Sequence, residues 1–362
     1  MKWQVIKNWL LLRLKRVILY GGFLALTFTI TAFFLLQLPA IQEALLSRYL
    51  RQFSSASNFP ITFEKFYLRW YDQLEMEGLE IKDSEKNTMI AIQKLSVNFR
   101  FQSLLDQNNV NIDGVEIDHA DVNLKTIQET DTSRNLNINV FINRLSGQPT
   151  GNANPPKINI GEISLEQSKF SFNETEHDSI TKGFDYHHFK IDVEADLNAF
   201  KVIGDTIEFN VNSMQAQDKK TGLKINHLST FYRISQTNME FLGLKLSANN
   251  SYVSDTIIFS YKSQRDLSEF NRRVNIKAKL KNTLIDPQDL ALFNAERILL
   301  PEPLELNGSI TGKVSSFVYK DMLAKLGKTS IEGTLRMDGL PTIAETFIDL
   351  SVEKGNVHIT DL

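Results

Sequence analysis

The stretch "LSVNFRF", Leu95 to Phe101, alternates apolar and polar side chains without a break. Leu95, Val97, Phe99 and Phe101 are apolar, and the three residues between them are polar. Successive side chains of a β-strand point to opposite faces, so this pattern predicts a strand with one apolar and one polar face. Such strands recur along most of the chain, whereas segments with the apolar spacing of a helix are few. Something other than helices must therefore cover the apolar faces.

The composition limits the classes of protein to which this chain can belong. It has 362 residues, a formal net charge of −3 and 42% hydrophobic residues. The small charge gives no reason to expect a nucleic-acid partner, and the hydrophobic content is that of a packed protein. Because the chain has no cysteine, disulfides, thiolate metal sites and cysteine nucleophiles are excluded.

The amino-terminal segment has the features of a membrane anchor. No residue from Val17 to Gln42 is charged, and about 20 apolar residues at about 1.5 Å each cover the roughly 30 Å hydrocarbon core of a bilayer. The charged residues before this run are all cationic: Lys2, Lys7, Arg13, Lys15 and Arg16. The positive-inside rule therefore predicts a cytoplasmic basic flank over 1–16, a transmembrane anchor over 17–38 and a body on the other side of the membrane.

A cleaved signal peptide is the less favoured alternative. Signal-peptide apolar regions span about 7–15 residues and end in a small-x-small site. Here a longer run leads through "QLPAIQEALLSRYL" without an evident site. We expect residues 39–59 to form a connector with a short amphipathic helix from Ile41 to Phe53.

Residues 60–362 are predicted to form one elongated antiparallel β body with few short helices. The turns between strands are rich in Gly, Asn and Asp, and the connections are too short for crossover helices. The expected strands are Ile61–Trp70, Leu74–Lys82, Met89–Phe101, Val110–Thr126, Ile158–Asn173, Phe189–Ala195, Thr206–Val211, Leu223–Ile234, Phe241–Ala248, Thr256–Tyr261, Val274–Leu280, Leu304–Val314, Ser330–Met337 and Ile348–Ile359. Short helices are expected in "NLNINVFINRL", "SEFNRRV" and "DPQDLALF", the last with Asp286 as N-cap and Pro287 at its first position.

An internal repeat supports this interpretation. "VNIDGVEIDHADVNL" from Val110 aligns with "INIGEISLEQSKFSF" from Ile158, 48 residues later. The apolar positions coincide, and both segments skip phase at the same two places. A bulge or turn at each place is expected to reset which side faces inward.

The motifs of catalysis and metal binding are not evident. The six histidines lack a metal-ligand spacing, and the adjacent His187 and His188 are expected to point to opposite faces of a strand. "GKTS" at Gly327 lacks the glycine that a phosphate-binding loop needs five positions earlier, where Met322 stands. We therefore expect no catalytic residues, no metal site and no cofactor, and a non-enzymatic protein.

Several segments together resemble a known family. The anchor with its "LPAIQEALLSRYL" exit, "GLEIKDSEKNTMIAIQKLSVNFRFQSLL" and "NVNIDGVEIDHADVNL" resemble the amino-terminal part of TamB-type translocation and assembly proteins, of the AsmA-like group. "FDYHHFKIDVEADLNAF", "GDTIEFNV" and "GLPTIAETFIDL" are similar to versions from the Bacteroidota. Since family members are usually far longer, we expect the strand system to continue in a longer native chain.

The resemblance implies both an architecture and a role. It implies a periplasmic sheet curled into an open apolar groove (a β-taco-like fold) that moves phospholipid towards the outer membrane or assists outer-membrane protein assembly. An outer-membrane barrel partner would be met by a carboxy-terminal part without a counterpart here. The expected groove lining is Leu95, Val97, Phe99, Phe101, Val122, Leu124, Phe170 and Phe172.

Alternatives remain open for both fold and function. Facing sheets could pack as a closed, dry sandwich instead of a groove. An anchored scaffold that binds proteins through its strand edges is the alternative function, and an anchored hydrolase is the least favoured.

Overall fold

The computed structural model describes residues 23, 26–69, 72–100, 103, 109–130, 133–145, 157–293, 300–340 and 342–358. The predicted cytoplasmic flank, residues 17–22, 24 and 25 of the predicted anchor, and Phe101 lie outside these residues. Within them no single helix has the length and apolarity to cross a bilayer. The helical segments Leu26–Leu36 and Pro39–Ser57 meet these criteria only as a pair, with a 74° bend between them.

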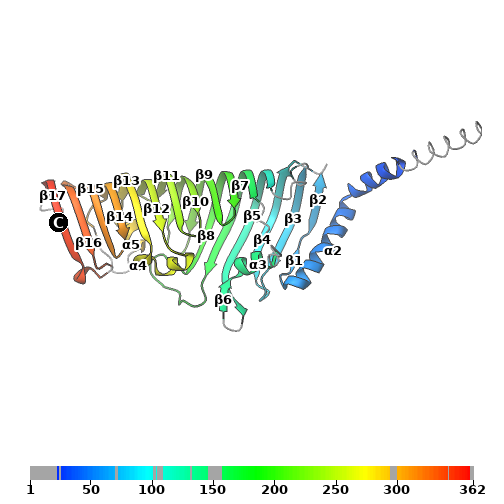
Figure 1. The fold of residues 1–362 in the computed structure, drawn as a ribbon, viewed down its shortest axis with the longest axis horizontal. Coiled ribbons are helices and arrows are strands. Elements are labelled where there is room, and N and C mark those ends of the chain that lie inside the picture. The colour runs from blue at the N-terminus through cyan, green and yellow to red at the C-terminus, as the bar shows by residue number, and fades with distance from the viewer. Residues whose placement is uncertain are drawn as a thin grey trace, which may run out of the picture.

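The described chain folds into one long mixed sheet of 17 strands (Figure 1). The strands are β1 (Ile61–Thr62), β2 (Lys65–Arg69), β3 (Gln73–Lys82), β4 (Thr88–Phe99), β5 (Asn109–Thr130), β6 (Ser133–Leu136), β7 (Lys157–Asn173), β8 (His188–Ile203), β9 (Thr206–Asp218), β10 (Lys224–Ile234), β11 (Asn238–Ala248), β12 (Ser251–Ser260), β13 (Asn275–Ile285), β14 (Leu304–Lys313), β15 (Ser316–Leu326), β16 (Thr329–Asp338) and β17 (Phe347–Asn356). The helices are α2 (Pro39–Ser57), α3 (Asn137–Leu145), η2 (Gln264–Glu269), α4 (Phe270–Arg273), α5 (Pro287–Phe293) and η3 (Ile343–Glu345). The prediction of a mainly β protein with few short helices is confirmed.

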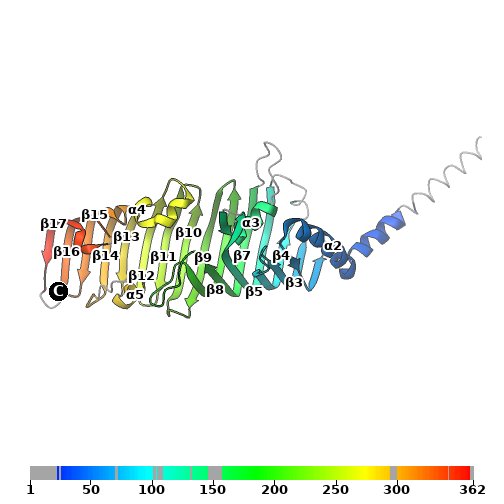
Figure 2. The same cartoon turned by 90° about the horizontal axis from the view of Figure 1, so that it is seen from below.

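The strands stack along the long axis of the molecule, with α2 and β2 at one end and β17 at the other (Figures 1 and 2). From β2 onwards each strand pairs with the next along the chain, except that β6 pairs only with the end of β5. The short β1 also pairs with β3, at Glu80 and Ile81, whereas β2 pairs with the first half of β3. No described pairing joins β17 to β2, so the sheet is not closed.

The expectation of a wholly antiparallel sheet is wrong at one pair. β5 and β7 run parallel. Parallel neighbours need a crossover connection, because the chain must return to the edge from which it started. The segment that contains β6 and α3 makes this return.

This parallel pair explains the internal repeat. The aligned residues of the two copies are register partners: Val110 faces Ile158, Val115 faces Ile163 and Val122 faces Phe170. The pairing is interrupted at the same two places where both sequences skip phase, while the offset between the partners stays at 48 residues. At the second of them, His119 and Gln167 both have left-handed backbones, with φ of 54° and 45°. The repeat is therefore structural, and its two copies lie side by side.

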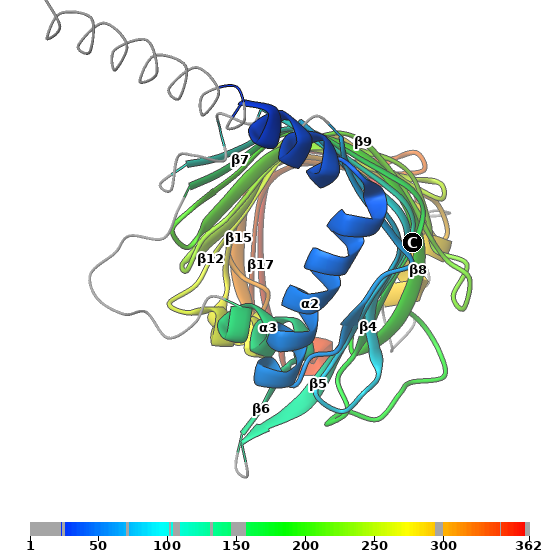
Figure 3. The same cartoon turned by 90° about the vertical axis from the view of Figure 1, so that its right-hand side faces the viewer.

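Bends of this kind recur along the sheet. Left-handed residues lie within several strands, among them Gly78, His119, Gln167, Ala199, Gly243, Asn282 and Asp321. The pairings near most of them shift register. A bulge bends its strand and strengthens the local twist. Figure 3, which looks along the long axis, shows the result: the strands curve around a central space.

Two strands are missing from the sequence-based prediction, β6 and β15. In β15 the apolar Val318 separates Phe317 from Tyr319, and the left-handed Asp321 then shifts the phase, so that Met322 is buried. The broken alternation hid the strand. For the same reason β8, β9 and β12 are longer than predicted.

The predicted helices are present. The helix expected at Ile41–Phe53 is α2, which begins with Pro39 and ends before Asn58, whose left-handed φ of 59° is typical of a helix C-terminus. In α5 the Asp286 carboxylate accepts a hydrogen bond from the Gln288 N–H at 2.8 Å, as an N-cap does. The other two expected helices correspond to α3 and to η2 with α4.

The one compact hydrophobic cluster found among the described residues lies where α2 and α3 meet the sheet. Its buried members are Phe59, Met89, Ile127, Val140 and Phe141. Ile81 and Ile90 of β3 and β4 pack against it, so these strands turn their apolar sides towards the helices. Figure 3 shows α2 in front of the central space, at the near end of the sheet, and α3 within the curve of the strands. Since the cluster packs against this side of β3 and β4, we identify it as the concave face.

At the bulge between β5 and β7, the Ser168 side chain replaces a missing main-chain hydrogen bond. Its hydroxyl oxygen accepts the Ala120 N–H at 3.0 Å and donates to the Glu166 carbonyl at 2.8 Å, and only 2% of the residue is exposed. We predict that Ser168→Ala leaves the buried Ala120 N–H without a partner, which costs about 1–3 kcal/mol. The measurement is chemical unfolding together with hydrogen exchange at the Ala120 amide.

Ser164→Ala is the matched control, because the Ser164 hydroxyl makes one exposed contact, to Asp196 at 3.4 Å. Equal stability and equal exchange in the two variants would contradict the role of Ser168.

Candidate functional site

The register of the sheet aligns apolar side chains into continuous rows across many strands. Directly opposed residues of paired strands lie on the same face. One row runs from β2 to β12 through Phe66, Met76, Leu95, Ile117, Leu165, Ala195, Met214, Leu228, Leu246 and Val253. Each neighbour along this row is a register partner.

Two further rows continue towards β17. The first joins Val110, Ile158, Val202, Ile207, Ile234, Met239, Phe259, Ile276, Gly312, Phe317, Met337 and Ile348. The second joins Phe209, Tyr232, Phe241, Ile257, Ala278, Ile310, Tyr319, Leu335 and Leu350. The apolar face thus extends from one end of the sheet to the other.

Bends keep the two halves of a strand on this face. Ile117 and Val122 are five residues apart, and an unbroken strand would point them to opposite sides. The left-handed His119 lies between them and resets the phase. Gly78, with φ of 64°, separates Met76 from Ile81 on β3 in the same way.

The opposite face carries charge. Next to the apolar residues Val202, Ile207, Ile234 and Met239 stand Lys201, Glu208, Arg233 and Glu240, which are also register partners. Arg233 contacts Glu208 at 3.1 Å and Glu240 at 3.5 Å, and Lys201 contacts Glu208 at 3.5 Å. This is a solvated outer surface, so the sheet is strongly two-sided.

The apolar rows are only half-buried. In the row that contains Leu95, Ala195 is buried, whereas every other member keeps part of its surface exposed. The residues of a packed core are mostly inaccessible. Because the described strands belong to one sheet, no second sheet covers this face, and a two-sheet sandwich does not describe the arrangement.

Aromatic rings reinforce the middle of the concave face. Phe200, Phe209, Tyr232, Phe241 and Phe259 follow one another across β8 to β12, with ring centroids 5.0–6.3 Å apart. Burial raises the pKa of the Tyr232 hydroxyl to about 12, and burial also raises that of Tyr319 to about 12. A charged phenolate is therefore strongly disfavoured on this face. The sequence prediction missed these residues. In their strands adjacent apolar pairs, such as Phe231 with Tyr232 and Ile258 with Phe259, interrupt the alternation that "LSVNFRF" shows.

The structure distributes the eight predicted lining residues differently. Leu95 and Val97 are half-buried, and Phe99 is 7% exposed. Phe99 follows a register shift and pairs with Ile112, which places it in a tighter environment. Phe101 lies outside the described residues.

The other four predicted residues form two register pairs, Val122 with Phe170 and Leu124 with Phe172, and all four are half-buried. Both phenylalanines contact the ring of Phe189, at 5.9 Å and 5.6 Å between centroids. They are thus brought together at one end of their strands.

The segment from Glu174 to His187, here called the strap, connects β7 to β8 at this end. Its Phe184 packs on Phe189 at 5.4 Å and on Phe293 of α5 at 5.9 Å. The Phe184 N–H also donates to the Leu292 carbonyl at 2.8 Å. The strap therefore links the β7–β8 connection to the β13–β14 connection along one rim of the sheet.

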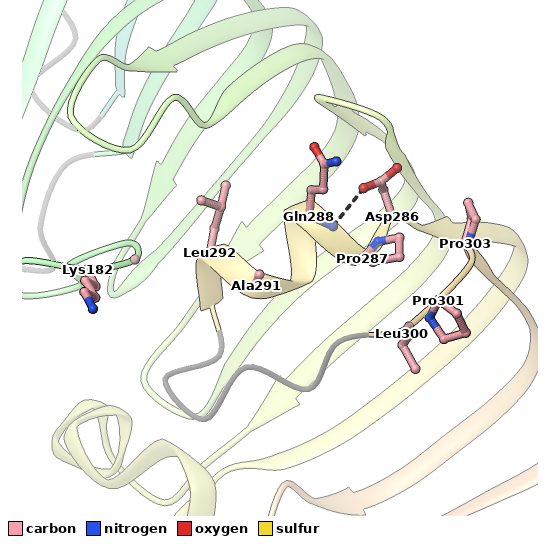
Figure 4. Close-up of a pocket in the computed structure, with 10 residues that line it drawn as sticks. Lys182, Asp286, Pro287, Gln288, Ala291, Leu292, Leu300, Pro301 and Pro303 are labelled. Atoms are coloured by element: carbon pink, nitrogen blue, oxygen red, sulfur yellow. Dashed lines mark hydrogen bonds between the residues drawn. The ribbon is translucent and has the colours of Figure 1, made fainter. Parts of the chain in front are cut away.

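A pocket of about 700 Å³ lies between the strap and α5 (Figure 4). It is lined by Lys182, Gly183, Asp286, Pro287, Gln288, Ala291, Leu292, Leu300, Pro301 and Pro303. Its ionisable side chains are Lys182 and Asp286, and Asp286 caps α5. This lining offers no nucleophile with an adjacent base.

The two ends of the sheet differ. At the first, the Gln42 side chain of α2 accepts the Leu68 N–H at 2.7 Å and donates to the Leu68 carbonyl at 2.9 Å, so it occupies the free edge of β2. At the other end, all ten residues of β17 are exposed. Phe347, Ile348 and Val352 are 63%, 53% and 54% exposed.

Comparisons of the chain with protein-family models, with curated proteins and with solved structures find no match. The concave apolar face is therefore the main guide to function.

Proposed function

We propose that this protein is an inner-membrane-anchored periplasmic bridge whose concave face forms an apolar groove for phospholipid acyl chains. The observation that carries the proposal is the set of continuous, half-buried apolar rows on one uncovered face of a single sheet. Moving a methylene group from water to such a surface contributes about 0.8 kcal/mol, so a lipid tail along the rows would be bound favourably. The resemblance to TamB-type proteins supports the same role.

The dimensions suit a bridge. Fifteen strands stack in series from β2 to β17, with β6 outside the series, and at about 4.8 Å per strand they extend roughly 70 Å. The charged outer face would keep such a body soluble in the periplasm. We propose that lipid moves along the rows towards the outer membrane, with a role in outer-membrane assembly.

A scaffold that binds proteins through a strand edge is the second candidate, and β17 favours it. An exposed edge strand presents unpaired N–H and C=O groups to which an extended peptide can add. This function and lipid transport are compatible on one molecule.

We predict that Val97→Asp leaves the protein folded but abolishes lipid contact. Val97 is half-buried, so an aspartate there can reach water while it places a charge among the acyl chains. The measurement combines thermal unfolding with photo-crosslinking to phospholipid from a photoreactive residue at position 95.

Two controls frame this test. Gln93→Asp changes an exposed residue of the same strand and should keep the crosslinks. Phe99→Glu puts a charge at a 7% exposed position and should unfold the region at a cost of several kcal/mol. Unchanged crosslinks in Val97→Asp, or its unfolding, would contradict the groove.

The proposed topology makes a separate prediction. A reporter enzyme that is active only in the periplasm, fused after residue 60, should be active, because the cations of 1–16 hold the amino terminus in the cytoplasm. The same fusion to a chain in which those five cations are replaced by glutamate should lose activity. Activity of a cytoplasm-specific reporter at residue 60 would refute the topology.

A further inference from the structure

The base of the strap brings together three side chains that can ligate a metal. They are Glu174, His177 and His187, whose ligand atoms all lie within 4.8 Å of one another. Glu174 Oε2 lies 2.5 Å from His187 Nδ1 and 3.8 Å from His177 Nε2. The two imidazole rings stack face to face, with centroids 3.8 Å apart and planes 16° from parallel.

The backbone holds these residues in place. The Glu174 N–H donates to the His187 carbonyl at 2.9 Å, which extends the β7–β8 pairing by one step. The His177 N–H donates to the Glu174 carbonyl at 3.1 Å and closes a turn. All three ligand positions are therefore fixed by main-chain bonds at the mouth of the strap.

Asp185 fixes the remainder of the strap. Its buried carboxylate accepts hydrogen bonds from the N–H groups of Ile180, His187 and His188 and from the Ser179 hydroxyl. These four hydrogen bonds anchor the backbone beside His187.

We propose that Glu174, His177 and His187 bind a divalent transition-metal ion of the zinc class. Two imidazole nitrogens and one carboxylate oxygen are a common zinc ligand set, and the remaining position can hold water. Zinc–ligand bonds of about 2.0–2.1 Å in a tetrahedron separate ligand atoms by about 3.3 Å. The side chains of the three residues are 31–52% exposed, so small rotations bring their atoms to this spacing.

Nitrogen ligands decide the class of ion. Calcium and magnesium prefer sites made entirely of oxygen atoms, whereas imidazole suits zinc, copper and nickel. The chain spacing, Glu-x-x-His and then His ten residues on, differs from familiar motifs, so the sequence does not reveal the site.

The metal would act on the strap. An ion bound by both His177 and His187 would close a loop that contains Phe184 and Tyr186. Loop closure lowers the conformational entropy of the undocked strap. The docked state, in which Phe184 contacts Phe189 and Phe293, is then favoured. The site would lock the rim beside Phe170 and Phe172, and this effect does not depend on what the concave face carries.

The test is calorimetric titration of the full chain with zinc chloride, after purification in detergent through a tag without histidine and treatment with a chelator. We expect one ion per chain. In hydrogen exchange, zinc should slow the amides of Phe184 to His188. Excess magnesium should not compete.

Three variants test the ligands: Glu174→Gln, His177→Ala and His187→Ala. Each should weaken zinc binding by at least about tenfold. Loss of a residue that only supports a ligand already costs about 10–100-fold in metal affinity, and these residues would bind the ion directly. His227→Ala replaces an exposed histidine of β10 that is not one of the three ligands; it is the matched control and should bind as the parent does.

Absence of saturable binding to the unmodified chain would overturn the proposal without any variant. Full affinity in the double variant His177→Ala/His187→Ala would also overturn it. Thermal unfolding without metal should be alike in all variants, since the replaced side chains are exposed. An affinity loss that coincides with unfolding in every ligand variant, together with no zinc-dependent exchange in the parent, counts against the site.

Discussion

Each long strand of this sheet must bend without turning its apolar side outward, and the bulges and left-handed residues meet both demands. The side-chain period of a strand is two, so an extra residue flips every later side chain unless the chain also changes hand locally. His119 and Gln167 supply that change at neighbouring places in β5 and β7. Ser168 then satisfies the Ala120 N–H that the bulge leaves unpaired. Curvature and a one-sided apolar surface thus have the same local cause.

The curvature of the sheet explains why the apolar rows are half-buried. A flat two-sided sheet of this length would need a second layer on its apolar face, as a sandwich has. In a curved sheet the apolar side chains of the concave face lie closer together and cover part of one another's surface. Residues such as Leu95 and Val97 are therefore half-buried. The compact cluster around Phe59 and Phe141 is confined to the end that carries α2 and α3. Along the remaining strands the apolar rows are half-buried, and this partial exposure is the basis of the proposed lipid groove.

Much of this fold could be predicted from the sequence, because regular alternation is a direct signal. "LSVNFRF" identifies a strand and places Leu95 and Val97 on one face, and "DPQDLALF" identifies a capped helix. The signal fails where a bulge interrupts it: Asp321 hid β15, and a register shift gave Phe99 a more buried position than its neighbours.

Pairing between segments that are distant in the sequence could not be predicted from the sequence pattern. The 48-residue repeat showed similarity, but similarity does not require adjacency, and the parallel contact of β5 with β7 depends on the return of the chain through α3. The cluster of Glu174, His177 and His187 depends on how one connection folds back on itself. Neither feature leaves a periodic trace in the sequence.

The central claim is that the concave face holds acyl chains, and native mass spectrometry of the intact chain released from mild detergent tests it most directly. The account predicts reproducible adducts with the masses of phospholipids that survive delipidating washes, and their loss in Val97→Asp but not in Gln93→Asp. A chain that is free of lipid in every preparation, with an intact fold, would contradict the account and leave the β17 edge as the functional surface.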